Sequence, residues 1–292
     1  MNYHYTNKRI KLKNILNENF HNYKLLNISY DFFSFFLFPF DTENVPVISV
    51  DPSKKYPHDK KAFTQGFEFY NGTFFEGTGL RGKSELREVN IFSGEVMRSR
   101  KLPPEFFGEG ITILDGKIYQ LTWQSGKGFE YDLATFKLIR EFEINGEGWG
   151  LTNDGNNLIM SNGTDKIIFL DPRSFKIIRT LSVTKNGKPQ NLLNELEFIK
   201  EEIWANVWKT DDILRINSKT GNVIGILDLS NISERVNLDD VANGIAWDKQ
   251  EDIVYVTGKL WNNVYKLNLN KGKVIKRSLI QTWFNSYKHL LR

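Results

Sequence analysis

The sequence contains no cysteine among its 292 residues. That absence excludes disulfides, thiol nucleophiles and thiolate metal sites. Histidine is also scarce: His4, His21 and His289 lie in the terminal segments, and His58 just precedes the internal repeats described below. A Ser-His-Asp triad or a histidine-based zinc site would need a histidine inside those repeats. Chemistry there must therefore use carboxylates, amides, Lys, Tyr or Trp.

An excess of charge of one sign is missing as well. The chain has 39 basic and 35 acidic residues, a net charge of +4, and its basic residues are scattered rather than gathered in a stripe. Nucleic-acid binding usually leaves a clustered basic patch. We therefore expect no nucleic-acid partner.

No apolar run is long enough for a membrane-spanning helix. The longest, Phe32–Phe40, follows a basic stretch and contains Pro39. It is either a weak signal or anchor segment or a tail that packs on the domain. We expect membrane contact only through residues 27–40. Two compartments remain possible. The segment would direct the protein to the secretory pathway or outside the cytoplasm if it is a signal, and otherwise the protein is soluble and intracellular.

What the sequence does contain is a repeat, in which short similar phrases each begin a strand pattern. Taking Gly66, Gly110, Gly150, Glu195 and Gly244 as equivalent, the steps are 44, 40, 45 and 49 residues. A period of about 40–50 residues with several strands per unit is typical of β-propeller blades. Aromatic residues make up 14% of the chain and suit strands. The sequence thus predicts an all-β, five-bladed β-propeller.

The fifth unit shows only three strand patterns, at residues 244–247, 253–257 and 264–269. A strand at 46–51, ahead of the repeats, could supply the fourth and close the ring without an exposed edge. We divide the chain into an N-terminal extension (1–44), a propeller catalytic domain (45–270) and a basic C-terminal tail (271–292). A closed ring has no need to oligomerise, so we expect a monomer.

Candidate site residues lie where the first strand of each unit begins and where the second strand ends. The first strand of a propeller blade lines the central channel, so the two sets could meet at one face. Each residue also has a purely structural interpretation, as core packing or turn formation. The set is Phe63, Gln65, Glu76, Glu109, Trp123, Trp149, Asn194, Glu195, Trp208 and Lys259.

Nine phrases, in order from about Tyr56 to Leu267, resemble the plant and bacterial type of glutaminyl-peptide cyclotransferase (glutamine cyclotransferase). One departure is Arg81, where the family often has Tyr, and residues 1–50 match nothing in the family. The phrases are Ala62–Phe67, Glu76–Leu80, Phe107–Gly110, Tyr119–Trp123, Gly148–Thr152, Leu193–Glu197, Ala205–Trp208, Asn243–Ala246 and Val256–Lys259.

The resemblance implies a five-bladed propeller that converts an N-terminal glutamine of peptides or proteins to pyroglutamate and releases ammonia. It also implies that no cofactor and no catalytic metal is needed. Glu109, between two glycines and near tryptophans, is our candidate for the proton shuttle, because burial should raise its pKa.

We expect the other residues to bind substrate, and the indole N–H groups to be among the donors to the reacting amide. These residues are Phe63, Gln65, Glu76, Trp123, Trp149, Asn194, Trp208 and Lys259. Glu76 is a second carboxylate candidate. The alternatives are a non-catalytic propeller that binds peptides or sugars, and a scaffold that docks proteins on its outer faces.

Overall fold

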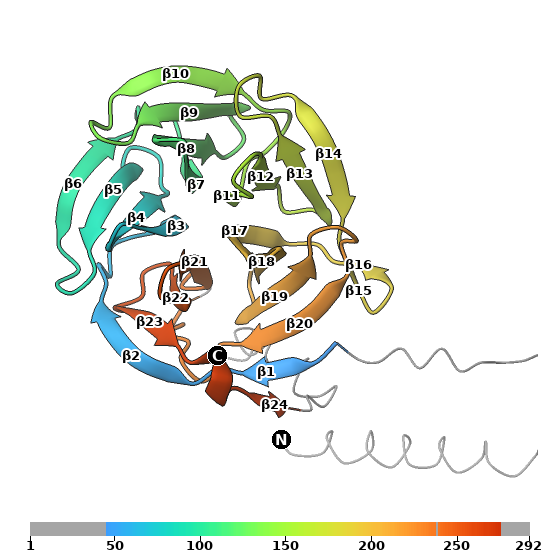
Figure 1. Cartoon of the computed structure of the whole chain (residues 1–292). Coiled ribbons are helices and arrows are strands. Elements are labelled where there is room, and N and C mark those ends of the chain that lie inside the picture. Colours follow the sequence, from blue (N-terminus) through green and yellow to red (C-terminus); the bar gives the residue numbers. More distant parts are fainter. Residues whose placement is uncertain (1–44, 238, 276–292) are drawn as a thin grey trace, which may run out of the picture. The chain divides into compact units, whose positions relative to one another are not determined.

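A computed structural model describes residues 45–237 and 239–275 of the chain. Five blades, each built on four antiparallel strands, are arranged around a central channel, with β3, β7, β11, β17 and β21 innermost (Figure 1). The prediction of an all-β, five-bladed propeller is confirmed.

The blades follow one another along the chain, each running from the channel outwards. Blade 1 comprises β3 (Thr64–Tyr70), β4 (Thr73–Thr78), β5 (Glu85–Asn90) and β6 (Val96–Lys101). Blade 2 comprises β7 (Gly108–Leu114), β8 (Lys117–Thr122), β9 (Lys127–Asp132) and β10 (Leu138–Glu143). Blade 3 comprises β11 (Leu151–Asn153), β12 (Leu158–Ser161), β13 (Lys166–Leu170) and β14 (Ile177–Ser182).

Blade 4 comprises β17 (Leu193–Ile199), β18 (Glu202–Val207), β19 (Asp212–Asn217) and β20 (Val223–Asp228), and the short hairpin of β15 (Thr184–Lys185) and β16 (Lys188–Pro189) precedes it. Blade 5 comprises β21 (Ala242–Asp248), β22 (Ile253–Gly258), β23 (Asn263–Leu267) and β2 (Pro52–Pro57). A one-turn 3-10 helix, η1 (Leu269–Lys271), leads to β24 (Lys273–Ile275).

The repeated glycines mark where the innermost strands of neighbouring blades touch. A Cβ atom at Gly110 would overlap the backbone nitrogen of Leu151, and one at Gly150 would overlap the carbonyl oxygen of Asn194. Glycine is required there because no side chain fits between the two backbones. In the fourth blade Glu195 takes this place, and its carboxylate accepts hydrogen bonds from backbone N–H groups of blades 5 and 1.

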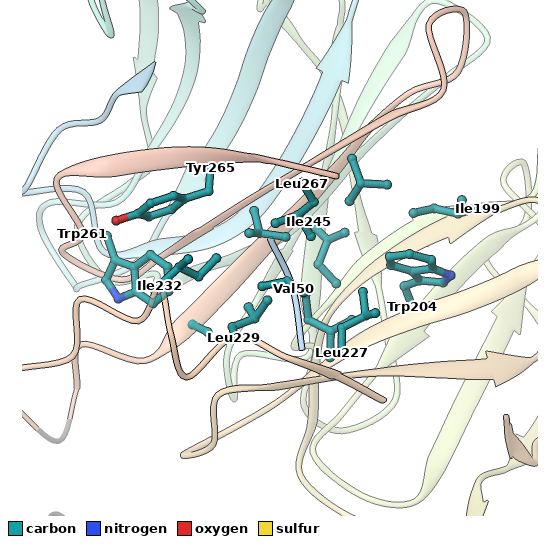
Figure 2. Packing of buried hydrophobic residues seen from close by; sticks show 14 residues of the cluster. Val50, Ile199, Trp204, Leu227, Leu229, Ile232, Ile245, Trp261, Tyr265 and Leu267 are labelled. Carbon is teal, nitrogen blue, oxygen red and sulfur yellow. The ribbon is translucent and has the colours of Figure 1, made fainter. Parts of the chain in front are cut away.

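Each pair of adjacent blades encloses its own apolar layer. Figure 2 shows the layer between blades 4 and 5, where Ile199 and Trp204 pack with Ile245 and Leu267. Val50, from the segment before β2, is buried in the same layer. Sheet faces with alternating apolar residues bury one face against each neighbour, so five blades give five such layers.

Arginines of the outer strands tie successive blades together. Arg98 on β6 lies 3.8 Å from the ring centroid of Phe136 in the next blade, and Arg140 on β10 lies 4.6 Å from that of Phe175. Together with Arg179 on β14, these guanidinium groups donate to turn carbonyls of the following blade, at Leu133, Arg173 and Ser218. The recurring turns after each third strand are therefore also the contact points between blades.

The ring is closed by an N-terminal strand, but not by the one predicted. The fourth strand of blade 5 is β2 (Pro52–Pro57), which pairs antiparallel with β23. The predicted segment 46–51 forms β1 (Val47–Ser49), which pairs parallel with β20 of blade 4 and antiparallel with β24. The burial of Tyr56 explains why β2 pairs with β23, because Tyr56 packs in the apolar layer between blades 5 and 1.

The predicted domain boundaries lie partly outside the described residues. The extension 1–44, with the apolar segment 27–40, falls outside them, and so does most of the tail 271–292. The end of the propeller at 270 is placed too early, because β24 continues the blade 4 sheet to Ile275. In the described ranges no helix has the length and apolar character to cross a membrane. The monomeric state stays a prediction.

Candidate active site

A cavity of about 210 Å³ opens at the end of the channel where the innermost strands begin. Eight of the ten candidate residues line it, together with two that were not predicted. The lining residues are Phe63, Gln65, Phe107, Glu109, Trp123, Trp149, Asn194, Trp208, Asp239 and Lys259.

The antiparallel pairing of each blade explains why distant phrases meet. Gly108 at the start of β7 pairs with Thr122 at the end of β8, which sets Glu109 beside Trp123. In blade 4 the pairing of Leu193 with Val207 sets Asn194 beside Trp208 in the same way. The start of an inner strand and the end of its neighbour thus share one edge of the sheet.

An irregularity of the β-bulge type recurs at this edge in four blades. The pairing register shifts around Gln65, Glu109, Asn194 and Asn243 in β3, β7, β17 and β21. A bulge bends a strand and re-aims a side chain. The β-bulge therefore recurs together with the strands, and it directs the side chains of Gln65, Glu109 and Asn194 into the cavity.

A directed chain of hydrogen bonds fixes the amide of Gln65. The Asn243 Nδ2 group donates to Gln65 Oε1 at 3.1 Å and to the Thr64 carbonyl at 2.9 Å. The Gln65 Nε2 group in turn donates to Glu109 Oε1 at 3.0 Å. Asn243 was not predicted as a site residue, although it belongs to one of the repeated phrases.

Burial disfavours the charged forms of both Glu109 and Lys259. Burial raises the pKa of Glu109 well above its ordinary value, the charge of Lys259 opposes this, and Glu147 reinforces it. Burial lowers the pKa of Lys259 to about 8, although Glu109 and Asp239 act in the opposite direction. Near neutral pH, Glu109 can therefore hold a proton that a reacting group could take and return.

Aromatic rings form the walls of the cavity. Trp149 and Trp208 meet edge to face with centroids 5.4 Å apart, and Phe107 meets Trp123 at 5.5 Å. The Lys259 ammonium lies 4.8 Å from the centroid of Phe63. This apolar lining accounts for the desolvation of the two ionisable groups.

Two of the three indole N–H groups expected to donate to substrate have an acceptor within the protein. Trp123 and Trp149 both donate to Oε2 of Glu147, each at 2.9 Å. Their N–H groups are thus occupied, and they offer the cavity ring surface rather than donors. Glu147 lies two residues before Trp149 and was not singled out in the sequence.

Glu76 does not line the cavity. Its Oε1 accepts from Thr64 Oγ1 at 2.7 Å and from His58 Nε2 at 2.9 Å, while His58 Nδ1 lies 2.8 Å from the Trp261 carbonyl. Burial alone would lower the pKa of His58, but the charge and hydrogen bond of Glu76 outweigh it and raise the pKa. For Glu76, His58 and Arg87 outweigh burial and lower the pKa. The pair therefore joins blades 1 and 5 as a buried ion pair.

Glu195 is placed in the channel wall rather than in the cavity. Its two carboxylate oxygens accept from the backbone N–H groups of Phe67 at 3.3 Å and Ile245 at 2.8 Å. Its carboxylate therefore links blade 4 to blades 1 and 5 at the channel.

Two lining residues escaped the sequence reasoning. Phe107 belongs to the quoted phrase Phe107–Gly110, so its signal was present. Asp239 lies in the long connection before β21, outside any repeat, and only the folded chain brings it beside Lys259. Among residues 45–237 and 239–275, no three His, Asp or Glu side chains are grouped as a metal-binding set.

Comparison with known proteins agrees with the resemblance seen in the sequence. The family model described as glutamine cyclotransferase matches residues 37–269, so the expectation that residues 1–50 match nothing in the family is wrong for residues 37–50. A curated glutaminyl-peptide cyclotransferase of Arabidopsis thaliana is 39% identical over 234 residues, which cover 78% of this chain and 73% of the relative. The crystal structure of Myxococcus xanthus glutaminyl cyclase matches with a TM-score of 0.73 and 31% identity, over 79% of this chain and 99% of that one. The chain belongs to the glutamine cyclotransferase family.

Proposed function

We propose that the cavity binds the N-terminal glutamine residue of a peptide or protein and closes it to pyroglutamate. The observation that carries this proposal is Glu109, a buried carboxyl with a raised pKa in a cavity walled by aromatic rings. The Arabidopsis and Myxococcus relatives bear the names of the same activity.

The reaction is a transfer within one substrate residue. The α-amino nitrogen attacks the side-chain carbonyl carbon and forms a C–N bond, and the bond from that carbon to the side-chain nitrogen breaks. A proton leaves the attacking nitrogen, and one must reach the departing nitrogen so that it leaves as ammonia. Glu109, protonated at the start, gives its proton to the departing nitrogen and takes one from the attacking nitrogen, so it is unchanged after one turnover.

The attacking amine needs no strong base. A free α-amino group has a pKa of about 7.7–8.0, so a useful fraction is neutral near pH 7. What the site must supply is orientation, and a near-attack geometry of an intramolecular reaction can supply several kcal/mol. The cavity of about 210 Å³ is smaller than pockets for drug-sized ligands, which suits a single residue end.

Uncharged and charged donors at the cavity stabilise the oxyanion that develops on the carbonyl oxygen. Asn194 is 3% exposed and its amide lines the cavity, and Lys259 is 5% exposed with a pKa of about 8. Both can donate to an oxygen that gains negative charge. Gln65 is held by Asn243 and Glu109, so its part is to orient Glu109.

The aromatic walls of Phe63, Trp123, Trp149 and Trp208 shield the reacting atoms from bulk water. Exclusion of water favours ring closure over hydrolysis of the amide. We also infer that acid–base catalysis proceeds without a catalytic metal, because the repeats contain neither cysteine nor histidine.

A synthetic peptide that begins with glutamine tests the proposal. Release of ammonia with the matching loss of mass from the peptide supports it. Binding of the peptide without a change of mass would indicate a non-catalytic peptide-binding propeller instead. Neither binding nor turnover would favour a scaffold whose channel is only structural.

A further inference from the structure

One carboxylate at the mouth of the cavity holds two of its aromatic walls. Glu147 lies in the loop between β10 and β11, and its Oε2 accepts from the indole nitrogens of Trp123 and Trp149, both at 2.9 Å. Its Oε1 accepts from Gln124 Nε2 at 3.1 Å. Trp123 follows β8 of blade 2, and Trp149 precedes β11 of blade 3. The carboxylate therefore links two blades at the site.

We propose that Glu147 is a positioning residue of this active site, which holds the Trp123 and Trp149 rings in one fixed arrangement through a shared carboxylate oxygen. The inference rests on the proposed cyclisation for its effect on catalysis, but the arrangement itself can be measured without turnover. Glu147 does not line the cavity, so it positions substrate through the two indoles rather than by direct contact.

The arrangement matters because an indole can present either its N–H edge or its face to a ligand. With both N–H groups bound by Glu147, the two rings cannot donate to the glutamine amide in a non-productive pose. Phe107 packs edge to face on Trp123, and Trp208 does so on Trp149. Edge-to-face packing does not by itself specify where the N–H group points, whereas a charge-assisted hydrogen bond to Glu147 does.

The charge of Glu147 has a second effect. Hydrogen bonding, first from Trp149 and also from Gln124 and Trp123, lowers the pKa of Glu147, so it is ionised near neutral pH. Its negative charge contributes to the raised pKa of Glu109. Removal of that charge should move the pH limb that reports Glu109 to lower pH, whether the ionised or the protonated form of Glu109 is the active one.

Two substitutions of Glu147 separate its effect on the position of the indole rings from the effect of its charge. In Glu147→Gln one carbonyl oxygen can still accept from both indoles, so kcat/KM at the optimal pH should stay within several-fold of wild type. In Glu147→Ala both bonds are lost, and kcat/KM should fall about 100-fold, the scale expected for reactants misplaced by about 1 Å. Both variants should shift the Glu109 limb to lower pH. Glu143→Gln and Glu143→Ala, at an exposed glutamate on β10, are matched controls that should change neither quantity.

An NMR experiment reads the arrangement directly. In ¹⁵N-tryptophan-labelled protein, two of the seven indole N–H resonances, assigned with Trp123→Phe and Trp149→Phe, should exchange slowly with solvent. Glu147→Ala should move both resonances and speed their exchange, and Glu147→Gln should leave both slow.

The outcomes are distinguishable. Indole resonances unchanged in Glu147→Ala, or activity equal to that of Glu143→Ala, would overturn the proposal. The proposal would also fail if Glu147→Gln kept the wild-type indole resonances but lost as much activity as Glu147→Ala. Holding the two rings in place would then not be enough without the charge of Glu147. If wild type binds a glutamine-initiated peptide but releases no ammonia, the proposed function fails. The positioning role would then stand on the resonances and on weaker peptide binding by Glu147→Ala.

Discussion

Glu109→Gln should remove catalysis while leaving the fold intact, and it should make the protein more stable at alkaline pH. Glutamine keeps the shape of the side chain and can still accept from Gln65 Nε2, which lies 3.0 Å from Glu109 Oε1. It cannot carry a proton between the attacking and leaving nitrogens. Loss of a proton-transfer group typically costs about 10²–10⁴-fold, or roughly 3–5 kcal/mol of barrier.

The stability effect follows from the raised pKa of Glu109. Below the unfolded pKa of about 4.3 both states keep the proton, so wild type and variant should differ little. As the pH rises above that value, Glu109 loses its proton in the unfolded chain but keeps it in the folded protein, where burial disfavours the charged form. The folded state therefore becomes less stable relative to the unfolded chain. Wild type therefore loses stability relative to Glu109→Gln up to the folded-state pKa.

The assay has two parts: ammonia release from a glutamine-initiated peptide, and denaturant unfolding at pH 5 and pH 8. Glu76→Gln is the matched control, because it breaks the buried pair with His58 and should cost about 3–5 kcal/mol near neutral pH. The reasoning is refuted if Glu109→Gln keeps activity within a few-fold of wild type. A stability difference that does not grow between pH 5 and pH 8 would refute the account of the buried carboxyl.

Three further outcomes are expected. Peptides with N-terminal glutamate should react far more slowly than glutamine peptides at neutral pH, because the same burial that raises the pKa of Glu109 disfavours a substrate carboxylate in the cavity. Similar turnover of glutamate and glutamine peptides at neutral pH would contradict this, and a peptide with acetylated N-terminal glutamine should not react. Phenanthroline should leave initial rates unchanged, whereas a rate that collapses and returns on addition of zinc would show that a metal is required. His58→Asn should cost most stability below about pH 6.5, and the loss should shrink as the pH rises through the raised pKa of His58, since a protonated histidine stabilises only while it stays charged. Unfolding free energies measured across that range test it, and a constant difference would argue against the ion pair.

The repeat made the blades and most of the cavity predictable. Each unit carries its own strand pattern, and the residues at strand starts and ends reach one edge whenever a blade pairs antiparallel. Gln65, Glu109, Asn194 and Lys259 could therefore be placed together without coordinates. Glu76 follows the same pattern but does not line the cavity, because its carboxylate pairs with His58, which lies outside the repeats. The closing strand was predicted at residues 46–51 but lies at residues 52–57. The strand that pairs with β23 is the one whose Tyr56 fills the apolar layer beside blade 1, and the sequence pattern did not show this.

The sequence by itself determined the number of blades, the absence of thiol chemistry and the carboxyl available for proton transfer, because these depend on residue type and local periodicity. Only the tertiary structure decided the partners of the polar groups. Glu147 binds two indoles from two blades, Asn243 of blade 5 orients Gln65 of the adjacent blade 1, and Asp239 reaches Lys259 from an irregular loop. Such contacts depend on how separate blades meet at the axis, and no spacing within one repeat contains that information.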